Sequence, residues 1–320
     1  MIDIRQTADR ELDCVGCGSC TVDILVHPVN LHEPIGTGQL HRVDPIGLSV
    51  GGIVSNAGIT LSRLGLRPAA FSAVGKDQWG DLVCQAYREA EIDAAHLIHH
   101  ASMPTSVTAV MIDADGERSF VHSQGAPKAM NREDYFAALP LFAKSRAMLL
   151  GYYPLLPNML DDLADVFKAI RSTGCLTALD AAGGGGTMQP LEHVLPHIDV
   201  YCPSFDEARN QTGLDSPEAI LNAYRDCGAT GWLGVKLGNR GALLSPSVGE
   251  FVQIEPAQPP SPVVDTTGAG DVFSAALLSA ILRGCDAQKA GNIAATAGAI
   301  SVIKPGATTA AMDWESVASK

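Results

Sequence analysis

The sequence predicts an α/β fold with a mostly parallel central sheet and a small β-sheet that stands off it as a lid. Three observations support this prediction. Strand-like and helix-like patterns alternate through most of the chain, which is typical of a parallel sheet covered by helices. Residues 105–123 break the alternation with a hairpin pattern around Asp113-Ala114-Asp115-Gly116. The length of 320 residues suits one large domain, so we expect residues 1–320 to form a single unit.

The expected elements follow from apolar periodicity and from end signals. A buried strand is predicted over Asp13–Val26. A helix capped by Asn158 has apolar residues at spacings of three, four and three and ends at Gly174. The other elements, in chain order, are a helix over Ser55–Gly65, a strand over Pro68–Val74, a helix over Asp81–Glu91, a strand over Cys175–Asp180, a helix from Ser216 to Gly228, a strand over Trp232–Leu237, and helices over Ala269–Arg283 and Asp286–Ile303.

Two segments outside this alternation are expected to form the lid. The first, 25–48, is rich in Gly, Pro and His and has alternating apolar positions near its end. The second, 104–123, contains the hairpin pattern. His122, at the end of that hairpin, either lies on the surface, which is the favoured interpretation, or touches a substrate.

Composition excludes several classes of protein. The chain has 22 Lys and Arg against 35 Asp and Glu, a net charge of −13, so it lacks the cationic surface that nucleic-acid binding requires. With 46% hydrophobic and 18% charged residues it is not intrinsically disordered. The longest apolar stretch, Ala290–Ile303, is too short to span a bilayer, and the charged first thirteen residues do not resemble a secretory signal. We expect a cytoplasmic protein without a membrane partner.

Three cysteines, Cys14, Cys17 and Cys20, form a C-x2-C-x2-C run. An iron–sulfur site is one interpretation, but the fourth cysteine followed by proline is missing. On a strand, residues 14 and 20 would face one side and residue 17 the other, so the thiolates could not converge. We therefore favour reduced, buried thiols.

The stretch with the most chemical information is Asp265-Thr266-Thr267-Gly268-Ala269-Gly270-Asp271, which leads into a predicted helix. Small residues before a helix let a ligand approach the backbone, and the first-turn amides can bind an anion. Asp271 would then be placed to accept a proton from a reacting hydroxyl. The alternative is an ordinary acidic residue that stabilises the helix dipole.

A second cluster lies far upstream, where Gly51-Gly52-Ile53-Val54-Ser55-Asn56-Ala57-Gly58 leads into another helix. The glycine pair allows close approach of a ligand, and Asn56 offers a donor and an acceptor to a polyol. The same upstream cluster includes Ala73–Asp81, which follows a predicted strand and contains two glycines. Each cluster alone could be no more than a helix entry or a strand exit.

Together these clusters resemble the two signature regions of the ribokinase (PfkB) carbohydrate-kinase family, in the same order and over 13–307. The resemblance implies a three-layer α/β/α sandwich with a β lid, ATP as phosphoryl donor, Mg2+, and a sugar or nucleoside acceptor. It also implies that Asp271 is the general base, and that Gly268, Ala269 and Gly270 form an anion hole for the migrating phosphoryl group.

The resemblance assigns further positions. Asp23, Gly51, Gly52 and Asn56 match the acceptor-binding residues. Lys236, Gly238, Gly241 and Asn292 match residues beside the nucleotide, although many members have Thr where this chain has Lys236. Asp265 and Thr267 resemble ligands of a monovalent cation such as K+ in some members. A lid of this kind often pairs between subunits, which makes a homodimer an expectation.

One departure from the family pattern concerns Mg2+. The usual N-x-x-E is here Ser204-Phe205-Asp206-Glu207, so Glu207 is retained while Ser204 replaces Asn. A serine hydroxyl can still hold a water molecule, and we expect Glu207 to bind Mg2+ through water and activity to survive.

The leading functional hypothesis is an ATP-dependent kinase that acts on a small sugar or sugar derivative. A nucleoside kinase on the same fold is the alternative, mildly disfavoured because only 5% of residues are aromatic. A sugar-binding regulatory protein without catalysis is the third hypothesis, supported only by Ser204. Specificity is expected from the lid and from loops such as Gly151–Pro154. A flexible surface loop is favoured for Gly183–Gly186 over a loop that lines a phosphate.

Overall fold

The computed structural model describes residues 9–32, 38, 40–114, 117–310 and 312–319. Their largest sheet has eight strands in the order β14-β13-β12-β11-β10-β9-β1-β4. These strands are β1 (Leu12–Gly18), β4 (Pro68–Phe71), β9 (Ser145–Gly151), β10 (Leu176–Leu179), β11 (Val200–Tyr201), β12 (Trp232–Lys236), β13 (Ala242–Ser245) and β14 (Val252–Ile254). From β4 to β12 all neighbours are parallel, whereas β13 and β14 are antiparallel.

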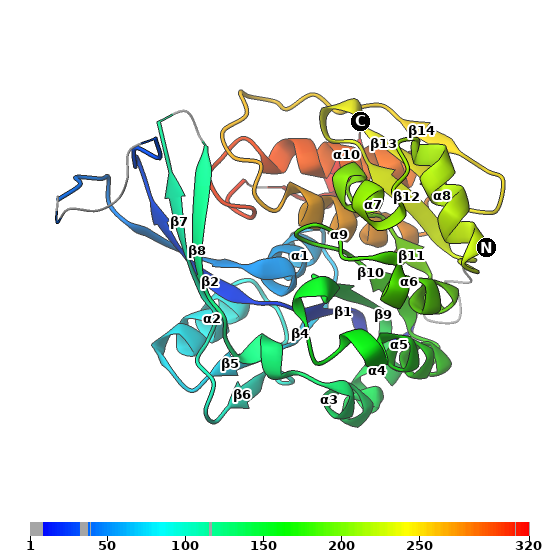
Figure 1. Cartoon of the computed structure of the whole chain (residues 1–320), viewed down its shortest axis with the longest axis horizontal. Coiled ribbons are helices and arrows are strands. Elements are labelled where there is room, and N and C mark those ends of the chain that lie inside the picture. Colours follow the sequence, from blue (N-terminus) through cyan, green and yellow to red (C-terminus); the bar gives the residue numbers. More distant parts are fainter. Residues whose placement is uncertain (1–8, 33–37, 39, 115–116, 311, 320) are drawn as a thin grey trace.

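Helices cover both faces of this sheet, so the predicted three-layer α/β/α sandwich is confirmed (Figure 1). One layer contains α1 (Gly52–Arg63), α2 (Gln78–Glu89), α9 (Ala269–Leu282), α10 (Ala287–Ser301) and α11 (Trp314–Ala318). The other contains α3 (Arg132–Ala137), α4 (Leu139–Ala143), α5 (Leu163–Ser172), α6 (Met188–Val194), α7 (Phe205–Thr212) and α8 (Pro217–Asp226). Parallel strands buried on both faces are largely apolar, as the run Met148, Leu149 and Leu150 in β9 illustrates.

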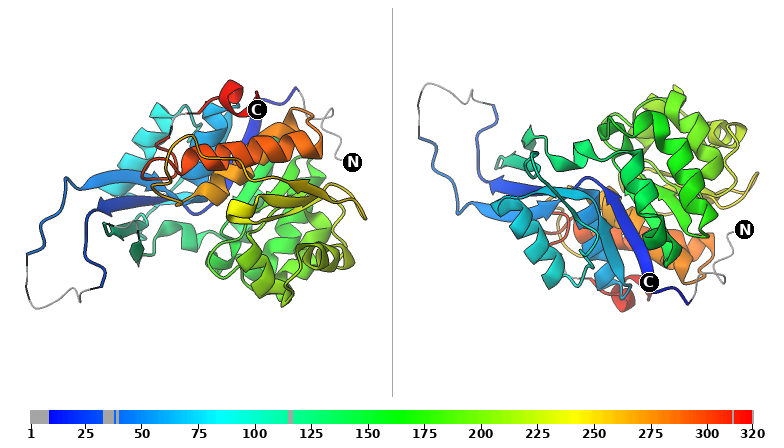
Figure 2. Two further views of the ribbon diagram at one scale, coloured as in Figure 1. Left: turned by 90° about the horizontal axis from the view of Figure 1, so that it is seen from above. Right: turned by 90° about the horizontal axis from the view of Figure 1, so that it is seen from below.

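A second, four-stranded sheet stands beside the sandwich as the lid (Figures 1 and 2). Its order is β3-β2-β7-β8, formed by β3 (Gly47–Gly51), β2 (Thr21–Val26), β7 (Val107–Ile112) and β8 (Arg118–Ser123). β7 and β8 lie within the expected range 104–123. The expected range 25–48 contributes only the end of β2 and the start of β3, and its residues 33–37 and 39, like the hairpin residues 115–116, lie outside the described residues.

The predicted continuous strand Asp13–Val26 is wrong, because the chain divides it between the two sheets. β1 ends at Gly18, which has a φ of 115° that glycine adopts readily and other residues rarely adopt. A Cβ at this position would lie 2.3 Å from the Gly151 carbonyl oxygen, so only glycine fits. β2 then begins at Thr21 in the lid. The predicted strand Pro68–Val74 is divided in the same way, since β5 (Ala73–Gly75) pairs with β6 (Ile98–His100) in a separate two-stranded sheet. The strand-like pattern continues across both breaks, so it does not indicate that the pairing partner changes there.

The three clustered cysteines are fully buried, and their side chains divide as expected. Cys14 and Cys20 pack in the core under one helical layer and Cys17 in the core under the other. Burial raises the pKa of Cys14 to about 12 and that of Cys20 to about 11, so both thiols stay protonated. The described residues contain no group of three or more His, Cys, Asp or Glu arranged to hold a metal ion.

Most predicted helices occur with shifted ends. α1 begins three residues earlier than expected, at Gly52, and α2 begins at Gln78. The expected cap at Asn158 is wrong: the side chain of Asn158 donates to the Ala129 carbonyl, and α5 begins at Leu163 after a short 3-10 turn. Among the described residues, no helix is both long and apolar enough to cross a bilayer.

Candidate active site

The candidate site forms where parallel strands of the main sheet end. Tyr152 directly follows β9, Asp180 directly follows β10, and Lys236 is the last residue of β12. Because the carboxyl ends of parallel strands meet at one edge, these three side chains are brought together there. The N-terminus of α9, which carries Asp271, lies at the same edge, since Tyr152 and Lys236 both contact its first turn.

Asp271 is nearly buried, with 5% of its surface exposed. Its Oδ2 atom accepts hydrogen bonds from Asn56 Nδ2 and from the Tyr152 hydroxyl, both at 2.7 Å. Burial raises the pKa of Asp271, against the opposing effects of these two hydrogen bonds and of the Lys236 charge, while Glu207 raises it further. The carboxylate is therefore held in one orientation and retains basicity, which suits a group that accepts a proton.

The backbone before α9 is shaped by glycine. Gly268 has a left-handed φ of 68°, and a Cβ on it would lie 2.3 Å from Ala307 Cβ. The amide of Ala269 donates to the Thr266 carbonyl oxygen at 3.3 Å, so the turn that precedes the helix already uses one of the three predicted anion-hole amides. The first-turn amide of Gly270 lies at the positive end of the α9 dipole.

Asn56 links the two sequence clusters. It comes from the first turns of α1, which Gly51 and Gly52 precede and open. While its amide nitrogen donates to Asp271, its Oδ1 atom is buried and has no hydrogen-bond partner among the described residues. A buried acceptor without a partner is costly, so a hydroxyl donor from a ligand would be favourable here.

Asp23, the predicted acceptor-binding carboxylate, lies in β2 against the glycine pair. A Cβ on Gly51 would lie 2.1 Å from Asp23 Oδ2, so only glycine leaves room for this carboxylate. Burial raises the pKa of Asp23 to about 6, although a hydrogen bond with Thr108 opposes the shift. Thr108 Oγ1 is also 2.9 Å from Nδ1 of the exposed His122. Thr108 therefore contacts both Asp23 and His122.

Lys236 lies beneath the first turn of α9 in a buried ion pair. Its Nζ atom is 3.2 Å from both carboxylate oxygens of Asp180, 3.3 Å from Ser274 Oγ and 3.4 Å from the Gly270 carbonyl oxygen. Burial alone would lower the pKa of Lys236, but the acidic groups around it, Asp180 foremost, raise it. The single ammonium group of Lys236 faces three carboxylates, those of Asp180, Glu207 and Asp271. Burial therefore raises the pKa of Asp180 to about 6 despite the ion pair with Lys236.

A pocket of about 380 Å³ opens beside the same helix. Three predicted nucleotide-site residues, Lys236, Gly238 and Gly241, line it together with the anion-hole residues Ala269 and Gly270. Its other walls are largely apolar, including Val263, Phe273, Ala295, Ala299 and Val302. Asn292 lines a neighbouring pocket of about 310 Å³ rather than the pocket that Lys236, Gly238 and Gly241 share. Its side-chain oxygen accepts a hydrogen bond from Gln288.

Ser204 and Glu207 form a capping box at the start of α7. Glu207 Oε2 accepts the Ser204 amide at 2.8 Å, and Ser204 Oγ accepts the Glu207 amide at 3.3 Å. The charge of Glu207 raises the pKa values of Asp180 and Asp271, which places its carboxylate in the same acidic group. This box explains why the sequence tolerates Ser204, since Ser and Asn cap helices about equally well.

Asp265 and Thr267, the predicted ligands of a monovalent cation, instead bind a guanidinium group. Arg118 Nη1 forms an ion pair with Asp265 Oδ1 at 2.7 Å and also contacts Thr267 Oγ1. Arg118 Nη2 donates to Thr266 Oγ1 at 2.9 Å. In this arrangement the positive charge beside Asp265 and Thr267 therefore comes from Arg118.

Three site residues were missed by sequence reasoning. Asp180 carried a usable signal, because it ends a predicted parallel strand. Tyr152 lies in a loop expected to govern specificity, but its contact with Asp271 depends on a left-handed φ of 61°, unusual for tyrosine, that nothing in the sequence indicates. Arg118 is one of several charged residues near a hairpin turn and had no distinguishing pattern.

Comparison with known proteins gives a consistent set of matches. The family model described as "pfkB family carbohydrate kinase" matches residues 13–314. The chain is 31% identical over 261 residues to ribokinase from Arabidopsis thaliana, a match that covers 76% of this chain and 64% of that protein, less than two thirds of its length. It is 27% identical over 290 residues to 2-dehydro-3-deoxygluconokinase from Bacillus subtilis, covering 84% of this chain and 85% of that protein.

Solved structures resemble this one over nearly their whole length. Arabidopsis thaliana ribokinase complexed with ribose and ATP has a TM-score of 0.81 and 25% identity, covering 96% of this chain and 98% of that one. Ribokinase from Giardia lamblia also has a TM-score of 0.81, with 21% identity, covering 96% and 99% of the two chains. The second likeness bears on the fold alone.

Proposed function

Because the chain belongs to the pfkB family of carbohydrate kinases, we propose that it transfers the γ-phosphoryl group of ATP to a hydroxyl group of a small sugar. The observation that carries this proposal is the buried Asp271 carboxylate, which Asn56 and Tyr152 hold at the N-terminus of α9. A catalytic base beside an anion-binding helix terminus is the arrangement that phosphoryl transfer to an alcohol requires.

In this reaction Asp271 accepts the proton of the attacking hydroxyl as the new O–P bond forms and the bond to the leaving ADP oxygen breaks. The Gly270 amide and the α9 dipole stabilise the negative charge of the migrating group. Lys236 adds a fixed positive charge next to that turn, because its Nζ atom lies 3.4 Å from the Gly270 carbonyl oxygen. Helix-terminal amides, Lys236 and bound Mg2+ would together supply the local positive charge that a polyanionic nucleotide needs in a chain of net charge −13.

ATP would occupy the pocket of about 380 Å³ that runs from Lys236 to the apolar wall of Phe273 and Val302. Its volume and apolar lining suit a purine ring, while the phosphates would lie toward Gly270. Mg2+ in kinases is held chiefly by phosphates and one or two carboxylates, and Glu207 suits that role. One Glu207 oxygen accepts the Ser204 amide, and its other oxygen can accept a hydrogen bond from a metal-bound water.

For the acceptor we propose a neutral polyhydroxyl compound. Asp23, Asn56, Asp271 and the glycine pair surround the acceptor position, and the two carboxylates attract hydroxyl donors while they repel an anion. The orphaned Asn56 Oδ1 would accept from the same sugar. A sugar acid such as the acceptor named for the Bacillus relative, or a nucleoside, would meet less favourable surroundings.

We further propose a cytoplasmic homodimer that associates through the lid. The lid and the segment that leads to β3 expose large apolar side chains: Ile46 and Leu48 are 59% and 53% exposed, and Phe120 and Val121 are 55% and 61% exposed. Exposed apolar patches favour association between subunits. All eight cysteines are free thiols, as expected in a reducing compartment. Phe120→Asp should convert the dimer to a monomer in sedimentation experiments; a wild-type protein that sediments as a monomer would overturn this proposal.

The function is tested by following ADP release with ATP and Mg2+ in the presence of pentoses, hexoses, 2-dehydro-3-deoxygluconate and nucleosides. We expect turnover with a neutral sugar and product phosphorylated on a hydroxyl. Turnover confined to the sugar acid or to a nucleoside would refute the proposed acceptor class. Sugar binding without turnover for any acceptor would refute the kinase assignment and favour a regulatory sugar-binding protein.

A further inference from the structure

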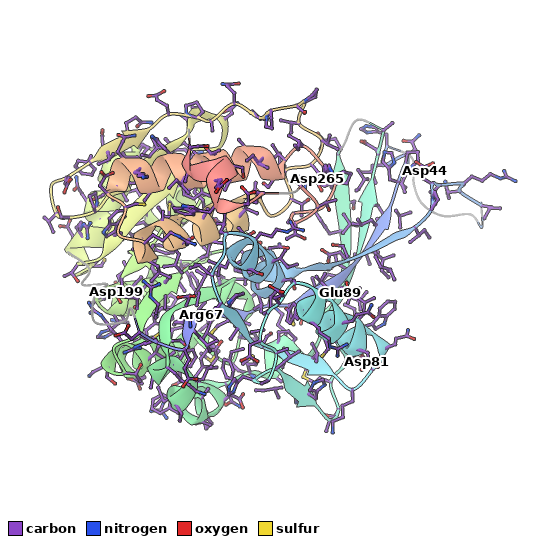
Figure 3. All side chains as sticks on the ribbon, turned by 180° about the vertical axis from the view of Figure 1, so that it is seen from behind. Asp44, Arg67, Asp81, Glu89, Asp199 and Asp265 are labelled. Atoms are coloured by element: carbon purple, nitrogen blue, oxygen red, sulfur yellow. The ribbon has the colours of Figure 1, made fainter. Side chains whose placement is uncertain are left out.

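Arg118 connects the lid to the segment that leads into the anion hole. It is the first residue of β8, 147 positions before Asp265 in the chain, yet its guanidinium contacts Asp265, Thr266 and Thr267. The side chain is 24% exposed and that of Asp265 only 9%, so the ion pair is largely removed from solvent. Figure 3 shows Asp265 at the junction between the helical layer and the lid strands.

Donors from the protein already surround the carboxylate of Asp265. Oδ1 accepts the Thr267 amide at 2.8 Å, the Thr267 hydroxyl at 2.6 Å and Arg118 at 2.7 Å, while Oδ2 accepts the Gly306 amide at 2.7 Å. Each carboxylate oxygen offers about two acceptor positions, so the three donors at Oδ1 leave no room there for a metal ion, while Oδ2 keeps one position beside the Gly306 amide. Thr267 Oγ1 takes part in the same group of contacts, because it donates to Asp265 Oδ1 and accepts from Arg118.

The consequence reaches the phosphoryl-transfer site through the backbone. Thr266 and Thr267 directly precede Gly268, and the Gly306 amide holds Asp265 next to Ala307, against which Gly268 packs. A cation at Asp265 therefore fixes the segment whose amides face the migrating charge. Arg118 supplies that cation from the lid, with a planar guanidinium that bonds three side chains at once.

We propose that the Arg118 guanidinium takes the place of a monovalent metal ion, so that this enzyme needs no K+ and its anion-hole segment is instead positioned by the lid. This inference rests on the proposed kinase function for its effect on turnover, but not for its effect on the ion preference of the folded chain. Arg118 acts as a positioning residue: it orders the Asp265–Thr267 segment and does not touch the reacting atoms.

The first experiment measures thermal unfolding of the full chain without substrates, in potassium and in tetramethylammonium chloride at equal ionic strength. We expect the wild-type Tm to be the same in both salts. Arg118→Ala should have a lower Tm in tetramethylammonium and should regain part of the loss in K+, because the freed carboxylate and hydroxyl can then bind the ion. Arg88→Ala, which removes an exposed arginine of α2, is the matched control and should respond to neither salt.

The second experiment repeats the comparison with turnover. Wild-type kcat should change by less than about twofold between the salts, whereas Arg118→Ala should lose about tenfold or more in tetramethylammonium and recover several-fold in K+. Arg118→Gln, which keeps a planar donor without the charge, should behave like Arg118→Ala and serves if the alanine variant fails to fold.

Two results would overturn the inference. One is a wild-type Tm or kcat that rises in K+ as strongly as that of the variants, because Arg118 would then leave the ion site available. The other is a loss of Tm and kcat in both Arg118 variants that is the same in the two salts, because K+ would then not replace the guanidinium. If no acceptor gave turnover, the kinase proposal would fail, while the unfolding measurements would still decide the role of Arg118.

Discussion

The hydroxyl of Tyr152 donates a hydrogen bond to Asp271 Oδ2 at 2.7 Å, although the two residues are 119 positions apart. Tyr152 follows β9 in a left-handed conformation, with φ at 61°, which is uncommon for a residue with a side chain. Backbone strain of this kind is found where a side chain must be aimed for function. Together with Asn56, Tyr152 therefore fixes the orientation of the carboxylate that we assign as the base.

Tyr152→Phe should retain the ring and lose only the hydrogen bond to Asp271. We expect kcat to fall by about tenfold with little change in KM for ATP, since a hydrogen bond to a charged group is lost at the base. The Tyr152 hydrogen bond lowers the pKa of Asp271, so its removal raises that pKa and moves the acidic limb of the kcat profile to higher pH. A pH profile that does not move, with kcat unchanged, would show that Tyr152 does not act on the base.

Lys236→Met should destabilise the fold as well as the reaction. Removing one partner leaves Asp180 as an uncompensated charge in a site of 2% exposure, which costs about 3 kcal/mol or more in the free energy of unfolding. The double variant Lys236→Met, Asp180→Asn should recover most of this stability without recovering turnover. Urea unfolding and ADP release measure the two effects. Stability that the second substitution does not restore would contradict a Lys236–Asp180 pair.

Asp23→Asn should stabilise the free protein at neutral pH. The pKa of Asp23 is raised from 3.8 to about 6 in the folded state, so folding favours the protonated form. The stabilising contribution of Asp23 to the free energy of unfolding is fully present below pH 3.8 and is lost as pH rises through about 6. Above pH 6 the free energy of unfolding of the variant should exceed that of wild type by about 1 to 2 kcal/mol, a figure that allows for partial solvent screening. Near pH 3 the two free energies of unfolding should be equal.

The same variant should bind sugar poorly, because the hydroxyl-binding carboxylate is gone. We expect KM for the sugar to rise by about a hundredfold, with KM for ATP unchanged. A variant that is less stable than wild type at pH 8, or that keeps its affinity for the sugar, would contradict the assigned environment of Asp23.

Ser204→Asn tests the single departure from the family pattern. Both residues cap a helix, so we expect the free energy of unfolding to stay within about 0.5 kcal/mol of wild type, whereas Ser204→Ala should lose about 1 kcal/mol. If Asn in the family pattern helps to organise Mg2+, the Asn variant should reach half-maximal turnover at a lower Mg2+ concentration. An unchanged Mg2+ requirement would limit the role of Ser204 to the Glu207 capping box.

The fold and much of the site could be predicted because short-range patterns encode them. Ser216 and Asp286 cap α8 and α10 as expected. α9 begins at Ala269, within the G-A-G-D stretch, as predicted. What failed depends on contacts between distant segments. The exchange of the chain between sheets at Gly18 requires the Gly151 carbonyl beside it.

The same limit explains the site residues that the sequence did not indicate. Arg118 reaches Asp265 only because the lid places the start of β8 beside the segment that precedes α9, and no local pattern in the hairpin indicates that contact. Tyr152 depends on a backbone conformation selected by the folded site. The resemblance places Asn292 beside the nucleotide, and Asn292 lines a pocket that adjoins the one lined by Lys236, Gly238 and Gly241.

The central claim is that Asp271 is the base of a phosphoryl transfer, and Asp271→Asn tests it most directly. The variant keeps the volume of the side chain and an oxygen that can accept from Tyr152 or Asn56, but it cannot take the substrate proton. We expect turnover with the best sugar to fall by at least about a hundredfold, while the Kd for ATP changes by less than about threefold. Turnover within about tenfold of wild type, from a variant that unfolds like wild type, would contradict the assignment.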